Sequence, residues 1–575
     1  MKFILSALFF IAMFIFIPAQ SNAADPVLFF SDITSGPSTG NGDGKGSGAI
    51  VTIWGNNLGT TKGSSRVTVG GADASYVYYW GKADRTGASG PADLYTYHRM
   101  QTISFAVGSG AANGAGEIYV TVNGKRSNSL PFTVRSGNIY FVKPTGTDSA
   151  SNGSWSSPWA SLSYAANGGG GKVLPGDIIY ATDGVQELSG LAMRDRIGTA
   201  AQPISFIAYP GANVVIQGSY GIGNYSGRSK FTNFSKFSIK TRSNGIDTHH
   251  GMRAVGNEIT NYPSGCADGQ GGAVSGSNQF QNTTGGNIKV FGNYIHDFGC
   301  DSTSKLHHVF YISNRGGYAV ESFELGWNYL ADNKAHHGLH VYDEGICGDF
   351  TGTMRIHDNV VVNQVGVAVG VASSGYSDPC FTMPVEIYNN LFINPGQETT
   401  SCSGHTQAIS FMKRTTRSTI KVYNNTLYGY GVNGDGYALM VQDKGSAEWN
   451  FGGRWEWVNN IIVDTKNRPY EDATYWDAAD VTGNNLYFNG GDSYPAAPPS
   501  WDSSASTANP MFIDVANKLF GLREGSPALG TGRSTTPVVV RDIRGMVRGQ
   551  GRNYSIGAFE SEDVLPPAAP ILSLR

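Results

Sequence analysis

Charged residues are scarce in this chain. Asp, Glu, Lys and Arg make up 15% of its 575 residues, and the formal net charge is only −3. This balance gives no electrostatic support for nucleic-acid binding. Apolar residues make up 40%, which is enough to bury a large core and excludes a disordered polyelectrolyte. The length allows two or more domains.

Long runs of Ala, Leu, Glu and Lys are missing as well. The chain is instead rich in glycine and tyrosine, with 77 and 29 residues respectively. Glycine favours turns, and aromatic residues favour strands over helices. The composition therefore predicts an all-β fold.

Cysteine is rare, and no pair has the CxxC spacing, which argues against a cysteine zinc site. An exporting cell would make disulfides plausible. The first two cysteines and the next two take similar places in successive repeats of the chain, so each pair could bridge adjacent coils and leave the fifth free. The five are Cys266, Cys300, Cys347, Cys380 and Cys402.

One long apolar run occurs, and it lies at the N-terminus. Lys2 precedes the apolar stretch 3–18, and small residues at 21–23 suit a cleavage site. This pattern is typical of a secretory signal peptide over residues 1–23, cut after Ala23, with an uncleaved anchor as the alternative. No later segment is long and apolar enough to cross a membrane. We expect a secreted, periplasmic or cell-surface protein.

The central part of the chain repeats one phrase, in which an apolar strand, an Asn and a second apolar pair follow each other. "KVFGNYIHDF", "RIHDNVVVNQ" and "EIYNNLFINP" are examples. A period near 30 residues with short strands indicates a parallel β-helix. The repeated Asn residues are Asn257, Asn293, Asn328, Asn359, Asn390, Asn425, Asn460 and Asn485.

A structural role explains this Asn column better than a catalytic one. Asn tolerates left-handed φ at a bend, and its amide can bond to the coil above or below. We therefore predict a stacked ladder that satisfies buried polar groups along the axis.

Residues 24–136 read as short alternating strands between Gly and Asn turns, which predicts a small β-sandwich. The elements "GAIVTIWGNNLG" and "SNSLPFTV" resemble the IPT/TIG immunoglobulin-like domain. The resemblance implies a fold and leaves the role of this unit open.

Residues 137–560 open with "NIYFVKPTGTDSASNGSW" and "PGDIIYATDGV". This entry resembles that of the chondroitinase B-like lyases of the pectate lyase-like superfamily, and "RDIRGMVRGQGRNYSIGAFE" resembles the closing strands of secreted β-helix enzymes. The resemblance implies a right-handed parallel β-helix that carries a polysaccharide lyase activity. An early helical stretch would cap the solenoid, and residues 561–575 form a Pro-rich tail.

Ten of the eleven His residues lie between His249 and His405. We align the strand phrases "HVFYIS", "HGLHVY", "VGVAVG" and "QAISFM", in which alternate apolar residues should face the core. Tyr311, His340, Ala368 and Ser410 then form one outward column. Small residues beside His and Tyr predict a groove for an extended polymer.

These groups suit β-elimination from a polysaccharide that contains uronic acid. A neutral His can remove the C5 proton, a Tyr hydroxyl can protonate the leaving O4, and Arg or Lys can hold the carboxylate. The candidate catalytic residues are His337, His340, Tyr311, His308, Arg315 and Lys305. The candidate substrate-binding residues are His307, His336, Lys334, Tyr342 and Ser410. For His308 and His337, which begin their strands, a structural role is the open alternative.

A metal requirement stays open at this point. The β-helix lyases commonly place Lys or Arg in the central roles and often use Ca²⁺, whereas this chain clusters His. Oxygen ligands on loops suit Ca²⁺. The acidic residues near the cluster are Asp301, Asp343, Glu344 and Asp349, whose spacing matches no recognised cation motif.

Three other functions compete with a lyase. A polygalacturonase-like hydrolase would carry "NTD", "DD" and "GHG" phrases and two spaced carboxylates, and a uronan C5-epimerase would carry Asp-Pro-His-Asp; none of these phrases occurs. A non-catalytic glycan-binding protein or adhesin fits the low net charge. In each case we expect an acidic polysaccharide as the partner, and the oligomeric state is left open.

Overall fold

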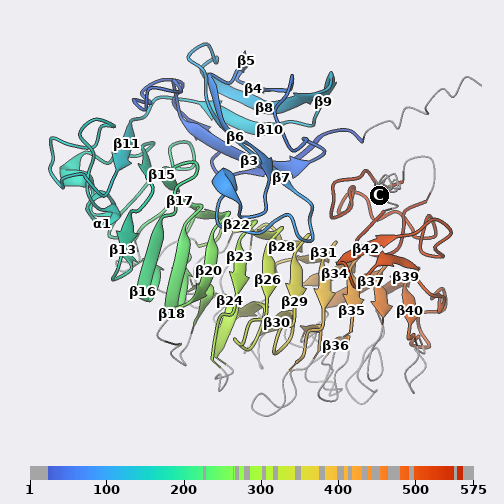
Figure 1. The fold of residues 1–575 in the computed structure, drawn as a ribbon. Coiled ribbons are helices and arrows are strands. Elements are labelled where there is room, and N and C mark those ends of the chain that lie inside the picture. The colour runs from blue at the N-terminus through green and yellow to red at the C-terminus, as the bar shows by residue number, and fades with distance from the viewer. Residues whose placement is uncertain are drawn as a thin grey trace, which may run out of the picture.

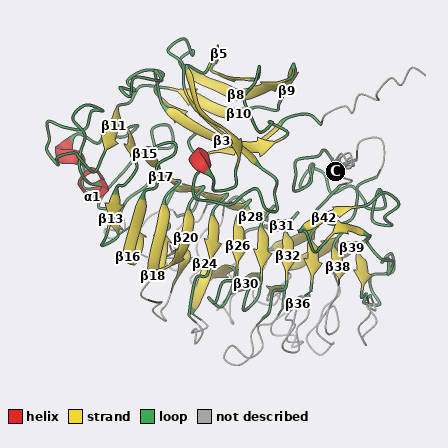
Figure 2. Cartoon of the chain, in the orientation of Figure 1, coloured by secondary structure: helices red, strands yellow, loops and turns green. Residues whose placement is uncertain are grey.

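The computed structural model describes residues 24–224, 228–262, 265, 271–277, 285–300, 306–314, 321–343, 351–373, 382–397, 407–411, 418–429, 438–441, 453–463, 479–490, 498–549 and 553–560. The predicted signal peptide and the tail 561–575 lie outside these residues. Almost all regular structure is strand (Figure 2), and the described helices are α1 (Leu162–Ala166), η1 (Gly87–Ser89) and η2 (Gly169–Gly171).

The N-terminal unit consists of two sheets. One has the strand order β1-β3-β7-β6 and is antiparallel; the other has the order β2-β10-β8-β4-β5, with β9 on β8 and only β2–β10 parallel. Alternate residues of both sheets enter one apolar core. The strands are β1 (Val27–Ser31), β2 (Ser35–Gly36), β3 (Ile50–Asn56), β4 (Arg66–Val69), β5 (Ala72–Asp73), β6 (Tyr76–Lys82), β7 (Gln101–Ala106), β8 (Gly114–Val122), β9 (Lys125–Arg126) and β10 (Leu130–Val134).

The described chain from residue 139 to residue 488 winds into a stack of coils (Figure 1), and each coil adds parallel strands to long sheets. The first sheet, which forms the first column of the coils, has twelve strands, all parallel to their neighbours. They are β11 (Ile139–Val142), β12 (Ile178–Ala181), β15 (Ile204–Ala208), β17 (Thr232–Ser235), β19 (Arg253–Val255), β22 (Ile288–Phe291), β25 (Phe323–Gly326), β28 (Met354–His357), β31 (Val385–Tyr388), β34 (Thr419–Tyr423), β37 (Arg454–Val458) and β39 (Val481–Gly483).

An 18-stranded sheet begins with β13 (Gln186–Glu187), β14 (Leu191–Ala192), β16 (Val215–Gly223) and β18 (Ser238–Asp247), and β18 then pairs with two strands at once. Two columns follow. The second column is β20 (Glu258–Asn261), β23 (Tyr294–His296), β26 (Tyr329–Ala331), β29 (Val360–Val362), β32 (Leu391–Ile393), β35 (Thr426–Tyr428), β38 (Ile461–Val463) and β40 (Leu486–Phe488). The third column is β21 (Gly271–Ser277), β24 (His307–Asn314), β27 (Leu339–Asp343), β30 (Val369–Ser373), β33 (Ile409–Phe411) and β36 (Leu439–Val441).

The three columns enclose one continuous apolar core, to which every coil contributes alternate residues of its strands. Helix α1 lies at the end of the stack (Figure 1) and buries Leu162, Ala165 and Ala166 against the first coils. The Ser161 hydroxyl caps this short helix by accepting a bond from the Tyr164 amide. The predicted fold class, a parallel β-helix preceded by a β-sandwich, is confirmed.

The predicted Asn ladder is present along the axis. The side-chain oxygen of each ladder Asn after the first accepts bonds of 2.8–3.1 Å from both the amide and the side chain of the Asn one coil earlier. All eight are buried. The predicted left-handed φ, however, belongs to the preceding residue in the bend, such as Asp358, Asn389 and Asn424 at +53° to +55°. The ladder Asn itself supplies only the amide.

Other parts of the chain cover the outer faces of two columns. Phe30 and Trp54 of the sandwich pack against Val255 and Phe291 of the first column. The second column packs its outer residues against the C-terminal part of the chain, including Phe520 in the hairpin of β41 (Phe512–Asp514) and β42 (Leu519–Leu522). Neither apolar contact involves the third column. Within the described residues, no helix has the length and apolar character needed to span a membrane.

One buried ion-pair system in the first column makes stability depend on pH. His357 Nδ1 lies 2.7 Å from Asp358 Oδ2, and its Nε2 lies 3.3 Å from Glu324 Oε1. Burial lowers the pKa of His357, but the bonds and charges of these two carboxylates outweigh it and raise the pKa to about 9. Since the raised folded pKa favours the charged ring, the stabilisation is complete below the unfolded value of 6.5 and is lost as the pH rises through 9.

We expect His357→Gln to remove this dependence. The wild type should lose up to about 3 kcal/mol of unfolding free energy between pH 6.5 and pH 9. The unfolding free energy of the variant should change less over the same range. Thermal unfolding followed by circular dichroism at several pH values measures the difference. Parallel curves for the two proteins would contradict the assignment.

Candidate active site on the third strand column

The outer face of the third column carries polar side chains in register. Tyr311 on β24 is directly opposite His340 on β27, and Ser313 is opposite Tyr342. The rings of Tyr311 and His340 lie 5.6 Å apart, and both tyrosines are partly exposed. The residues between them, Ile312 and Val341, are buried in the core, as the alternation predicts.

Small residues continue this face on the next coils. His340 is opposite Gly370 on β30, and Gly370 is opposite Ser410 on β33. The alignment of the sequence placed Ala368 in this column, which is wrong by two residues. A Cβ atom on Gly370 would lie 3.2 Å from His340 Cδ2, so glycine leaves room for the imidazole ring.

Two further histidines, His308 and His337, pack next to His340 and Tyr311. His308 Nε2 lies 3.3 Å from His340 Nδ1, and the His308 ring also stacks on Tyr311 at 5.1 Å. His337 lies one coil beyond His308, with the two rings 5.0 Å apart and 7° from parallel. The His337 ring is 4.5 Å from that of His340. Three imidazoles and a phenol from two adjacent coils therefore form one connected cluster.

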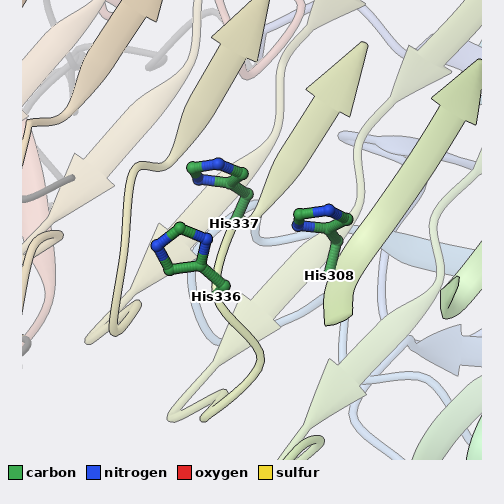
Figure 3. A group of neighbouring side chains, drawn as sticks. All are labelled: His308, His336 and His337. Atoms are coloured by element: carbon green, nitrogen blue, oxygen red, sulfur yellow. The ribbon is translucent and has the colours of Figure 1, made fainter. Parts of the chain in front are cut away.

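His336 approaches the same cluster from the segment before β27. Its ring is 4.1 Å from that of His337 and 6.2 Å from that of His308. One ring nitrogen of each of these three residues lies within 4.8 Å of the others. Figure 3 shows the three rings around one space. The His336 backbone lies close to Gly366, where a Cβ would be 2.0 Å from the His336 carbonyl oxygen, so only glycine fits there.

The remaining candidates lie elsewhere. His307 is fully buried, packs edge-on against Phe298 at 5.0 Å and places Nε2 3.3 Å from the Ser243 carbonyl oxygen, so it does not reach the outer face. Lys334 is exposed two residues before His336. Outside the described residues or side chains lie Lys305, Arg315 and the acidic residues Asp301, Asp343, Glu344 and Asp349.

Asp247 is a site residue that the sequence did not reveal. It ends β18 and pairs with Ser275, which in turn pairs with Tyr311, so it stands in the Tyr311–His340 column. Burial raises the pKa of Asp247 to about 6. The signal in the sequence was its position just before the pair His249-His250, but only the register of the long strand β18 places it on this face.

Cys300 is buried and disulfide-bonded. The other four cysteines lie outside the described residues, and the pairing with Cys266 therefore stays a prediction.

No family model matches the chain, and no curated protein is similar in sequence. Several solved structures are similar in part. A structure described as XylC in complex with xylose has 12% identity and a TM-score of 0.33 over 61% of this chain and 75% of that one. The GH136 lacto-N-biosidase from Eubacterium ramulus has 16% identity and a TM-score of 0.33 over 64% and 67%. The PL6 family alginate lyase AlyGC has 14% identity and a TM-score of 0.32 over 75% and 60%. Similarity at this level does not identify an activity.

Proposed function

We propose that this protein is a secreted polysaccharide lyase that cleaves a polymer containing uronic acid by β-elimination on the outer face of the third strand column. The observation that carries the proposal is the pair of Tyr311 and His340. Two groups capable of proton transfer stand opposite each other on adjacent strands, with the small residues Gly370 and Ser410 beside them. The export step rests on residues 1–23, read as a signal peptide.

The reaction needs a base and an acid. His340 would take the proton from C5 of the uronate, the C4–O4 bond would break as a C4–C5 double bond forms, and the Tyr311 hydroxyl would donate its proton to O4. Products with unsaturated and saturated ends result, and no water is consumed. His340 is 9% exposed, which keeps the imidazole in contact with the surface yet sheltered by its neighbours.

The hydrogen bond between His308 and His340 bears on the choice of base. In the tautomer in which the Nδ1–H of His340 donates to His308 Nε2, the basic nitrogen of His340 is Nε2, and this atom would accept the proton from C5. His337, stacked on His308 and next to His340, holds both rings in place. His308 and His337 therefore act as positioning residues in this proposal.

An enolate-like intermediate also needs positive charge near the carboxylate. Arg315 and Lys305 were the predicted partners, and Arg315 follows β24 directly in the sequence. Both roles stay predictions, since these two residues lie outside the described part of the chain. Lys334 is an exposed cation close to His336 in the sequence.

One assay tests the proposal. The mature protein is incubated with a panel of acidic polysaccharides, and the ultraviolet absorbance of unsaturated sugar ends is followed together with reducing ends. A lyase produces both signals. Reducing ends without the absorbance indicate a hydrolase, and this result would overturn the proposal. Retention on a glycan column without either signal would indicate a binding protein, with the same consequence.

A further inference from the structure

We propose that His308, His336 and His337 form a binding site for a divalent transition-metal ion such as Zn²⁺. Each residue offers one ring nitrogen, and the three nitrogens lie within 4.8 Å of one another. All three side chains are buried. They come from β24 and from the segment before β27, so the site joins two successive coils (Figure 3).

The ligand set selects the class of metal. Neutral imidazoles favour Zn²⁺, Co²⁺, Ni²⁺ and Cu²⁺, whereas Ca²⁺ and Mg²⁺ take oxygen ligands. Three histidines with one open position are also a common ligand set of catalytic zinc sites. The inference therefore differs from the Ca²⁺ expectation, which rested on carboxylates in loops.

Metal binding requires an adjustment of the rings. Zn–N bonds of 2.0–2.1 Å place tetrahedral ligand nitrogens about 3.3 Å apart, so nitrogens that now lie within 4.8 Å of one another must approach by up to about 1.5 Å. The rings of His308 and His337 are 7° from parallel, so at least one of them must also turn toward the ion. Rotation about side-chain torsions supplies such a shift. Nε2 of His308 lies against His340, so Nδ1 of His308 is the nitrogen available to an ion. With the ion on Nδ1, Nε2 carries the proton and donates to His340 Nδ1, so the bond between the two rings runs in the opposite direction from the one in the metal-free base assignment.

A purely structural ladder is the competing explanation of these rings. The ladder that this chain builds along its axis consists of Asn amides, one from each coil, each bonded to the next. The histidine group differs, because it takes two adjacent residues, His336 and His337, from one coil and one from the coil before. Gly366 lets the His336 backbone come close, since any Cβ there would collide with it.

A bound ion would add two positive charges next to His340 and Tyr311. This role rests on the proposed lyase function: the ion would attract the uronate carboxylate and support the negative charge that develops on it. Metal binding itself does not depend on that function, and the test below therefore contains no polysaccharide.

The experiment is a titration of the chelator-treated mature protein with Co²⁺, followed by its visible absorption bands, with Zn²⁺ added afterwards as a competitor. We expect one Co²⁺ per chain, displacement by Zn²⁺, and a higher midpoint of thermal unfolding with Zn²⁺. His337→Asn and His336→Asn should each weaken binding at least about 100-fold. His296→Gln removes an imidazole on β23 and should bind as the wild type does.

Two results would overturn the inference: no saturable Co²⁺ binding by the wild type, or wild-type affinity in folded His336→Asn and His337→Asn. Circular dichroism of each variant establishes that it is folded. If one variant fails to fold, the other variant and the stoichiometry of the wild type still decide. A protein that binds the ion but cleaves no polysaccharide would leave this inference intact and remove the proposed function instead.

Discussion

Replacing His340 with alanine is expected to lower kcat about 10³-fold, because a positioned general base contributes roughly 10² to 10⁴ in rate. Tyr311→Phe should lower kcat by about 10² or more through loss of one hydroxyl. The imidazole of His340 and the hydroxyl of Tyr311 contribute in the transition state, when the protons move, and not to the binding of the substrate. The loss should therefore appear in kcat and kcat/KM together, with KM little changed. Initial rates from the absorbance of unsaturated ends measure all three parameters.

His296→Gln is the matched control for both variants. His296 is a partly buried histidine on β23, where it bonds to Glu258 and Asp297 and stands in a different strand column. Its loss should leave kcat within about a factor of two, since its partners among the described residues, Glu258, Asp297 and Tyr294, do not belong to the Tyr311–His340 face. Activity of folded His340→Ala and Tyr311→Phe within tenfold of the wild type would place the reaction elsewhere.

The repeat period and the Asn column predicted the fold because both follow from local chemistry. Each coil needs one buried amide at the same bend, and that need is written into the sequence at every repeat. The sequence could not place the left-handed residue. Asp358 and Asn389 adopt positive φ just before the ladder, but so does Trp327, so no single residue type marks this position in the sequence.

The candidate site was predicted less completely, for a physical reason. A strand pattern fixes which residues face outward but leaves the register ambiguous by two, since Val367 and Val369 are equally apolar. The structure pairs His340 with Gly370 and not with Ala368. The alternation of inward and outward side chains along a strand also says little about the residues that precede the strand. The convergence of His336 and His337 on His308 therefore emerges only from the stacked coils.

Removing one amide from the axial ladder should be among the most destabilising single substitutions in this chain. The Asn359 side chain accepts bonds from the amide and the side chain of Asn328, and it donates to Asn390 and to the Leu325 carbonyl oxygen. In Asn359→Ala these buried groups lose their partners at a cost of about 1–3 kcal/mol for each unsatisfied group. We expect a total loss of about 3–6 kcal/mol in unfolding free energy. Denaturant unfolding measures it.

Asn363→Ala is the control within the same coil. Its side chain donates to Asp332 and accepts from Asn394, but these bonds lie closer to the surface, where water can replace them, and its φ is +51°. Alanine there should therefore cost only about 1–2 kcal/mol, mainly from backbone strain. Amide hydrogen exchange should localise the difference, because Asn359→Ala opens the coils on both sides, whereas Asn363→Ala affects one turn. Equal costs for the two substitutions would mean that strand packing alone holds the coils together and that the ladder only fills the bend.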